Sequence, residues 1–211
     1  MKRSETLTLA GPAGALEARL EIPEDLPGPA LAFGVVCHPH PLHGGTMDNK
    51  VAHVIARAMM ESGAPTFRFN FRGVGASAGK FDEGRGETDD LAAVVAEGRR
   101  RFPGAALWLG GFSFGAFVAL RAAPLLQPAK LVAVAPPVAR FDLGSVGHPE
   151  CEWMLAQGDA DEVVPSQEVL NWAGSAPQGR TPRLHVLAGA GHFFHGRLHE
   201  LKPLVLEFLG S

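Results

Sequence analysis

Hydrophobic positions along the chain follow two spacings, which alternate from one segment to the next. Segments that alternate at period two or are continuously apolar predict strands, and apolar residues at helical spacing predict helices. Strands are expected at residues 5–9, 16–22, 31–37, 65–71, 105–111, 130–135, 151–157 and 183–189, and helices at 49–62, 87–101, 114–123, 165–173 and 198–209. This order predicts an α/β fold with a mostly parallel central sheet, helices on both faces and an N-terminal antiparallel hairpin.

Several residues mark where the predicted elements begin and end. Asp48 is the expected N-cap of the first helix, and Gly63 follows its last turn. Pro124 is expected to end the helix at 114–123, because proline cannot continue the hydrogen-bond ladder. A Pro-rich connector at 22–30 separates the hairpin from the next strand.

Composition narrows the class of protein. The 211 residues are 46% hydrophobic and 19% charged, which suits one domain spanning 1–211. The net charge of −3 predicts no nucleic-acid partner, and no apolar run approaches the roughly 20 residues of a membrane span. The start lacks an apolar signal segment, and Cys37 and Cys151 are far apart. We therefore expect a cytoplasmic protein without membrane contact.

The pattern G-x-S-x-G occurs twice, around Ser113 in "GFSFG" and around Ser77 in "GASAG". A nucleophilic serine needs a sharp turn between a strand and a helix, with glycines where side chains would collide. An apolar strand precedes Ser113 directly and a helical pattern follows it, whereas Gly-rich and charged residues follow Ser77. Ser113 is therefore the predicted nucleophile, and Ser77 is expected in a structural turn.

Activation of a serine requires a general base and a carboxylate that orients it. In open α/β sheets these groups follow the carboxyl ends of strands. Asp159, Asp161 and Glu162 follow the strand at 151–157, and His192 follows the strand at 183–189. His192 is the predicted base, and the carboxylate is Asp161 or Asp159.

Three of these segments, "GFSFG", "GDADEVVP" and "GAGHFF", resemble in that order the serine hydrolases of the α/β-hydrolase superfamily. With "HPHPLHGGTMDNK" and "RFNFRGVGASAG", the chain resembles small, lidless bacterial members akin to dienelactone-hydrolase-like enzymes. The second segment matches a D-x-R-G-x-G-x-S loop, with Asn70 in place of aspartate. True dienelactone hydrolases carry cysteine where this chain has Ser113, so their activity is not implied.

The resemblance implies roles for further residues. The pattern G-x-x-D-x-x-V selects Asp161 as the triad carboxylate and leaves Asp159 to organise the turn through an Asx-type hydrogen bond. The oxyanion hole is expected from the backbone N–H of Phe114 and a second amide in "CHPHPLHGG". Prolines cannot donate, so the second amide is that of His40 or, as the alternative, Leu42.

The three histidines of "CHPHPLHGG" also raise a metal site, because His38 and His40 share a face in an extended chain. That segment has no acidic ligand, and a metal would leave the serine motif unexplained. We expect no metal and no cofactor. Cys37 is interpreted as a small buried hydrophobe.

The link at 135–150 is too short for a cap domain, so an open site for short acyl esters is expected. Leu42, Phe112 and Phe193 are candidate pocket residues, with core packing as the alternative for the phenylalanines. The expected partner is a small-molecule acyl substrate, and a homodimer stays open. The predicted function is a carboxylesterase-like serine hydrolase. Alternatives are a peptidase or thioesterase with the same triad, or a non-catalytic binding protein of this fold.

Overall fold

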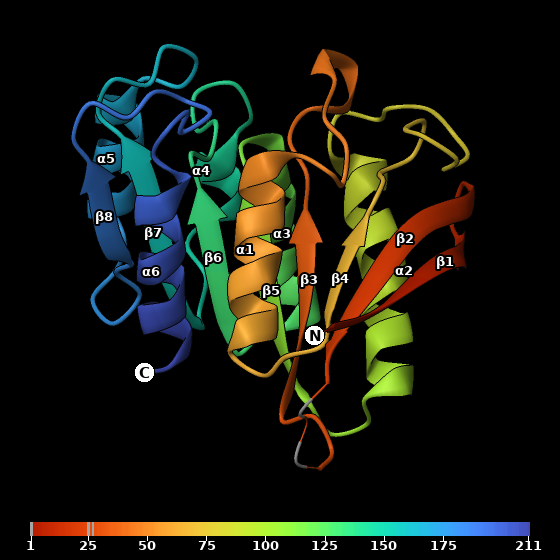
Figure 1. Cartoon of the computed structure of the whole chain (residues 1–211). Helices are drawn as coiled ribbons and strands as arrows, with labels where there is room; N and C mark the ends of the chain where they lie inside the picture. Colours follow the sequence, from red (N-terminus) through yellow and green to blue (C-terminus); the bar gives the residue numbers. More distant parts are fainter. Residues whose placement is uncertain (1, 25, 27) are drawn as a thin grey trace.

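The computed structural model describes residues 2–24, 26 and 28–211, and its eight strands form one twisted sheet (Figure 1). Asp25 and Pro27 of the expected connector lie outside the described residues. The strand order is β1-β2-β4-β3-β5-β6-β7-β8. The bounds are β1 Lys2–Gly11, β2 Gly14–Pro23, β3 Ala32–Cys37, β4 Thr66–Phe69, β5 Ala106–Phe112, β6 Lys130–Val134, β7 Glu152–Gly158 and β8 Arg183–Leu187.

The sheet is parallel except at its N-terminal edge. β1 and β2 form an antiparallel hairpin, and β2 also runs antiparallel to β4. All neighbours from β4 through β3 to β8 are parallel, so their carboxyl ends meet at one edge. This architecture confirms the predicted fold class.

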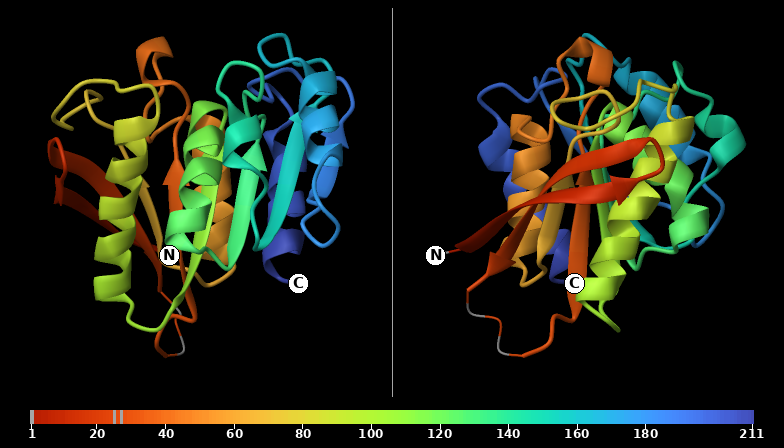
Figure 2. Two further views of the ribbon diagram at one scale, coloured as in Figure 1. Left: turned by 180° about the vertical axis from the view of Figure 1, so that it is seen from behind. Right: turned by 90° about the vertical axis from the view of Figure 1, so that its right-hand side faces the viewer.

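Helices cover both faces of the sheet (Figure 2). α1 (Lys50–Glu61) and α6 (Leu198–Leu209) lie against one face, and α2 (Arg85–Arg101), α3 (Phe114–Leu126) and α5 (Ser166–Gly174) lie against the other. The remaining helical pieces are the 3₁₀ turn η1 (Pro41–His43) and the four-residue α4 (Leu143–Val146). The sequence pattern predicted neither short piece.

Two hydrophobic cores result, one on each side of the sheet. Successive residues of β3 show why: Val35 packs into the core beneath α2 and α3, and Val36 packs into the core beneath α1 and α6. A strand buried on both faces reads as a continuous apolar run, which is the pattern that predicted it.

Two predicted boundaries are wrong. Asn49, not Asp48, caps α1, because its Oδ1 accepts from the N–H groups of Val51 and Ala52 at 2.9 and 3.2 Å. Asp48 pairs instead with Arg68 at 3.0 Å. Pro124 lies inside α3, which continues to Leu126. The proline lies in the last turn, where little of the hydrogen-bond ladder remains, and Leu126 beyond it is buried in the core.

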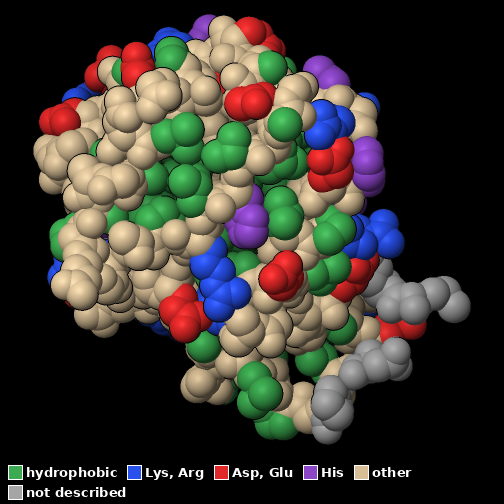
Figure 3. Space-filling model, turned by 90° about the vertical axis from the view of Figure 1, so that its left-hand side faces the viewer, with side chains coloured by type: hydrophobic (Ala, Val, Ile, Leu, Met, Phe, Trp, Pro, Cys, Tyr) green, Lys and Arg blue, Asp and Glu red, His purple; other side chains and the backbone are tan. Residues whose placement is uncertain are grey.

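No cap covers the carboxyl edge of the sheet: between β6 and β7 the only helix that the structure describes is α4. At the β8 edge, Leu184 and Val186 remain 44% and 46% exposed. Figure 3 faces this side of the molecule and shows hydrophobic side chains gathered among polar ones.

No helix within the described ranges has both the length and the apolar character needed to cross a bilayer.

Candidate active site

Ser113 occupies the turn between β5 and α3. Its backbone has φ 54° and ψ −120°, a conformation that few non-glycine residues adopt, and its N–H donates to the Val134 carbonyl at 2.8 Å. A Cβ on Gly111 would collide with the Gly115 carbonyl, and one on Gly115 would collide with the Cys37 carbonyl. Glycine at both positions therefore permits the tight turn and brings it against the end of β3.

The Ser113 hydroxyl is hydrogen-bonded to His192, with 3.0 Å between Oγ and Nε2. The other ring nitrogen, Nδ1, lies 2.8 Å from Oδ2 of Asp161. These three side chains come from the turn after β5, the loop after β7 and the loop after β8. Parallel strands of one sheet end at the same edge, so residues 79 positions apart in the chain meet there.

The Asp161 carboxylate is held by four donors. Oδ1 accepts from the backbone N–H groups of Val163 and Val164 at 2.9 and 2.7 Å, and Oδ2 accepts from the Gln157 side chain at 3.0 Å as well as from His192. Burial opposes ionisation, but the hydrogen bonds from His192 and the two amides outweigh it, so the pKa of Asp161 is lowered. The carboxylate is therefore charged at neutral pH.

The two neighbouring acids position the histidine loop. Asp159 accepts from the N–H of Gly189, and Glu162 Oε2 accepts from the N–H of His192 at 3.1 Å. The Asx-type turn expected at Asp159 is instead made by Asp161 with Val163. Sequence reasoning missed the roles of Gln157 and Glu162, because nothing in a single sequence separates them from ordinary polar residues at a strand end.

The histidines of 37–45 have separate surroundings. His38 is fully buried, its Nδ1–H donates to the Pro39 carbonyl at 2.6 Å, and its Nε2 accepts from the Phe71 N–H at 3.1 Å. Burial lowers the pKa of His38 to about 4. Both ring nitrogens are thus used by the backbone, and neither is available to a metal. No group of three or more metal-ligating side chains is found in the part of the chain that the structure describes.

His40 contributes differently. Its Nδ1 accepts from the Leu42 N–H at 3.2 Å, so the Leu42 amide is already engaged. Partial burial, with His43 and Arg140 nearby, lowers the pKa of His40 to about 4. The backbone N–H groups of His40 and Phe114 donate to no other described residue, and both residues line the space in front of Ser113. Of the two amides that the sequence left open, only that of His40 is therefore free to face an oxyanion.

A cavity of about 400 Å³ opens in front of Ser113 and His192; we call it the Ser113 cavity. Its wall is mostly apolar, and it includes Pro137, Phe141, Val163, Val164, Pro165 and Phe193. The position of Phe193 agrees with the expected pocket role. The pocket roles expected for Phe112 and Leu42 are wrong: Phe112 is fully buried beside the His192 ring, and Leu42 is 69% exposed and does not line the cavity.

Ser77 is part of the loop after β4 and does not line this cavity. Its hydroxyl donates to the Asn70 carbonyl at 2.7 Å and accepts from the Glu17 N–H at 2.9 Å. The Asn70 side chain in turn donates to the Glu17 carboxylate at 2.7 Å. The second G-x-S-x-G copy therefore joins the hairpin to the loop, as the structural interpretation expected.

Comparisons with known proteins agree with this architecture. A family model described as serine aminopeptidase S33 matches residues 40–143. An α/β serine hydrolase without a lid, from Xanthomonas campestris, is 43% identical with a TM-score of 0.93, and the match covers 99% of this chain and 94% of that one. An α/β serine hydrolase homologue from Coxiella burnetii is 42% identical with a TM-score of 0.91 and 96% coverage of each chain.

An uncharacterised protein from Rickettsia prowazekii is 31% identical over 208 residues, which is 94% of this chain and 86% of that protein. The Xanthomonas structure is described as lacking a lid, and both structural matches extend over nearly the whole chain. The chain therefore belongs to the lidless α/β serine hydrolases of the α/β-hydrolase superfamily.

Proposed function

We propose that this protein is a carboxylic ester hydrolase that uses Ser113 as nucleophile, His192 as general base and Asp161 as the orienting carboxylate. The observation that carries the proposal is the continuous hydrogen-bonded chain from Ser113 Oγ through both His192 nitrogens to Asp161, at 3.0 and 2.8 Å. A hydroxyl becomes an effective nucleophile only with such a base in reach.

The reaction proceeds in two halves. Ser113 Oγ attacks the ester carbonyl while its proton passes to His192 Nε2, and the charged Asp161 stabilises the imidazolium. The oxyanion accepts hydrogen bonds from the free amides of Phe114 and His40. His192 then protonates the departing alcohol. In the second half His192 activates a water molecule, which releases the acid from Ser113.

The apolar wall of the Ser113 cavity supports an acyl substrate of modest size. A volume of about 400 Å³ lies near the lower end of the range for small-molecule sites, and no cap in the described chain closes over it. Short and medium acyl chains are therefore the expected substrates.

The direct test measures hydrolysis of p-nitrophenyl butyrate and labelling by a fluorophosphonate probe. Wild-type protein is expected to hydrolyse the ester and to be labelled, whereas Ser113→Ala does neither. Ser77→Ala is the matched control, because it changes the other G-x-S-x-G serine, and labelling should persist. Absence of labelling above the Ser113→Ala background would refute the hydrolase proposal.

The description of the matching family model favours one second candidate, an aminopeptidase that uses the same triad. Aminoacyl p-nitroanilides test it in the same assay format. Turnover of these amides with kcat/KM above that of the esters would replace the esterase assignment and leave the triad unchanged.

A further inference from the structure

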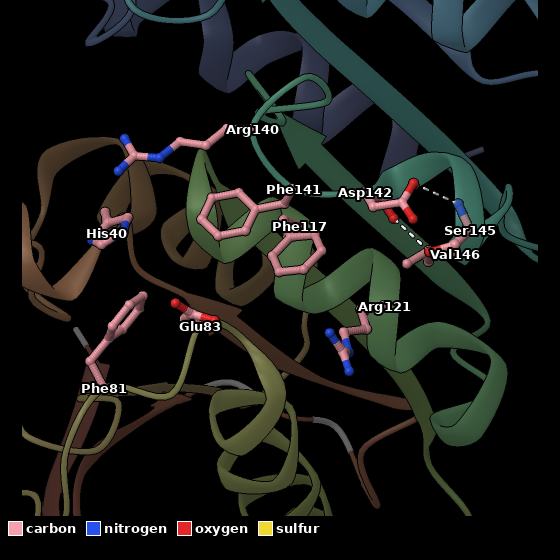
Figure 4. A pocket seen from close by; sticks show the side chains of 10 residues that line it. All are labelled: His40, Phe81, Glu83, Phe117, Arg121, Arg140, Phe141, Asp142, Ser145 and Val146. Carbon is pink, nitrogen blue, oxygen red and sulfur yellow. Dashed lines mark hydrogen bonds between the residues drawn. The ribbon is translucent and has the colours of Figure 1, made fainter.

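A second cavity, of about 640 Å³, adjoins the Ser113 cavity; we call it the Phe117 cavity (Figure 4). The two cavities share His40, Arg140 and Phe141 in their walls. Phe141 and Phe117 stack with ring centroids 4.6 Å apart at 18°, which gives the Phe117 cavity an aromatic surface. In Figure 4 the Arg140 guanidinium extends toward His40, and Arg121 lies at the opposite end.

Among the residues that the structure describes, Arg140 is the one lysine, arginine, aspartate or glutamate that lines the Ser113 cavity. Its guanidinium lies 6.0 Å from the centroid of the Phe141 ring, and it forms no ion pair with any carboxylate among the described residues. An unpaired cation at the boundary of two cavities is a ready partner for an anion, and the planar guanidinium suits a carboxylate.

Each acid that the structure describes in the Phe117 cavity has a nearby partner other than Arg140. The Asp142 carboxylate accepts from the Ser145 N–H at 3.2 Å and caps α4, and Glu83 lies 3.8 Å from Arg85. The backbone around Arg140 is also anchored, because the N–H groups of Arg140 and Phe141 both donate to the Pro137 carbonyl at 3.2 Å. Hydrogen bonds therefore hold the backbone that carries Arg140, whereas its guanidinium has no ion-pair partner among the described residues.

We propose that Arg140 binds a carboxylate on the acyl part of the substrate, so that the preferred esters are those of acids with a second, negatively charged carboxyl group. This inference rests on the proposed hydrolase function. It adds a residue that determines specificity and names the substrate class.

The acyl side follows from the place of the base. His192 must protonate the leaving alcohol, so the alcohol lies toward His192 and the acyl chain extends away from it. His192 lines the Ser113 cavity but not the Phe117 cavity, whereas His40, Arg140 and Phe141 line both. An acyl chain that leaves the carbonyl on the side opposite His192 thus passes Arg140 on its way into the Phe117 cavity.

The test compares p-nitrophenyl monoesters of adipate and suberate with p-nitrophenyl hexanoate and octanoate, which have the same chain lengths without the charge. For the wild type, kcat/KM is expected to be higher for a charged ester than for the neutral ester of the same chain length. In Arg140→Gln the ratio of kcat/KM for the charged to the neutral ester should fall about tenfold, the scale of a charge-assisted hydrogen bond at a partly exposed position. Arg140→Lys should restore part of the ratio.

Arg57→Gln is the matched control, because Arg57 is an exposed arginine of α1, paired with Glu61 and outside both cavities. An unchanged ratio in Arg140→Gln at both chain lengths would overturn the proposal. An equal fall in Arg57→Gln would also overturn it, because the preference would then depend on the overall charge of the protein and not on Arg140.

A binding measurement separates this proposal from the hydrolase assignment. Titration calorimetry with monomethyl adipate compares Ser113→Ala with Ser113→Ala/Arg140→Gln, neither of which needs turnover. At least tenfold weaker binding to the double variant supports carboxylate recognition even if no ester is hydrolysed. Equal binding to the two variants contradicts it even if the enzyme is active.

Discussion

The imidazole of His40 accepts a hydrogen bond from the Leu42 N–H, with 3.2 Å between Nδ1 and the amide nitrogen. The side chain of His40 thus binds the amide two positions further along the chain, and the His40 amide is free beside Ser113. The side chain of His40 therefore holds the 3₁₀ turn while its main-chain N–H is free, and a mutation can change the first without the second.

His40→Ala keeps the main-chain N–H and removes the acceptor of the Leu42 amide. We expect kcat/KM on p-nitrophenyl butyrate to fall about tenfold, because the 3₁₀ turn is loosened by roughly one hydrogen bond. His40→Asn offers a shorter acceptor and should lose less. A loss in His40→Ala as large as that in Ser113→Ala would mean that the imidazole itself takes part in the reaction.

Asp161 and Asp159 lie two positions apart but have different partners, so their variants should differ. Asp161→Asn is expected to lower kcat by roughly 10³–10⁴-fold, because the amide no longer stabilises the His192 imidazolium or its tautomer. Asp159→Asn removes only a charged acceptor of the Gly189 N–H, and kcat should stay within about tenfold of wild type. The reverse order of the two losses would reassign the triad carboxylate.

Burial of His38 makes stability depend on pH. Its pKa is about 4 in the folded protein, against an ordinary value of 6.5, so below pH 6.5 the unfolded chain binds a proton that the folded protein does not. The free energy of unfolding is therefore highest above pH 6.5 and falls as the pH drops toward 4. At pH 5 the loss due to His38 is about 2 kcal/mol.

Urea unfolding at pH 7.5 and pH 5 measures that loss. His38→Gln keeps a donor and an acceptor but does not titrate, so its loss of unfolding free energy should be smaller than that of wild type by about 2 kcal/mol. His195→Gln, which alters an exposed histidine, should behave as wild type. An equal loss in wild type and His38→Gln would show that His38 is not the group responsible.

Gly115 brings the serine turn against the end of β3. In Gly115→Ala the new Cβ would meet the carbonyl oxygens of Cys37 and His38, so we expect about 3 kcal/mol of destabilisation and loss of ester hydrolysis. Gly174→Ala, at the end of α5 where a Cβ meets nothing within 4 Å, should unfold at nearly the wild-type urea concentration. Similar midpoints for the two variants would contradict the close approach.

Asn70 stands where the D-x-R-G-x-G-x-S loop of the superfamily has aspartate. Its contact with the Glu17 carboxylate accounts for the difference. The Asn70 amide donates to the Glu17 carboxylate at 2.7 Å and its oxygen accepts from the Met47 N–H at 2.8 Å. Asn70→Asp would set two carboxylates against each other, and we expect a loss of about 2 kcal/mol in urea unfolding at pH 7. Adding Glu17→Gln should recover part of it. Wild-type stability in Asn70→Asp alone would refute this pairing.

Much of the architecture could be predicted because burial leaves a local record in the sequence. The closing helix was expected at 198–209 and lies at Leu198–Leu209, and the apolar run that predicted β3 is buried on both faces. The ends of elements were less predictable. Asp48 and Asn49 are both good capping residues. Asn49 caps the helix because Asp48 forms an ion pair with Arg68 of β4, which is distant in the sequence.

The sequence by itself determined the fold class, the serine turn and the histidine that follows β8, because strand and helix periods, glycine spacing and chain order are local signals. The resemblance pointed to Asp161, and the tertiary structure showed that it is the carboxylate in contact with His192. Only the tertiary structure decided which amide in 37–45 is free and that Arg140 is unpaired between two cavities. These properties depend on loops that parallel strands bring together from distant parts of the chain. A hydrogen bond between such loops forms only where distance and direction in space allow it, and these cannot be read from the order of residues.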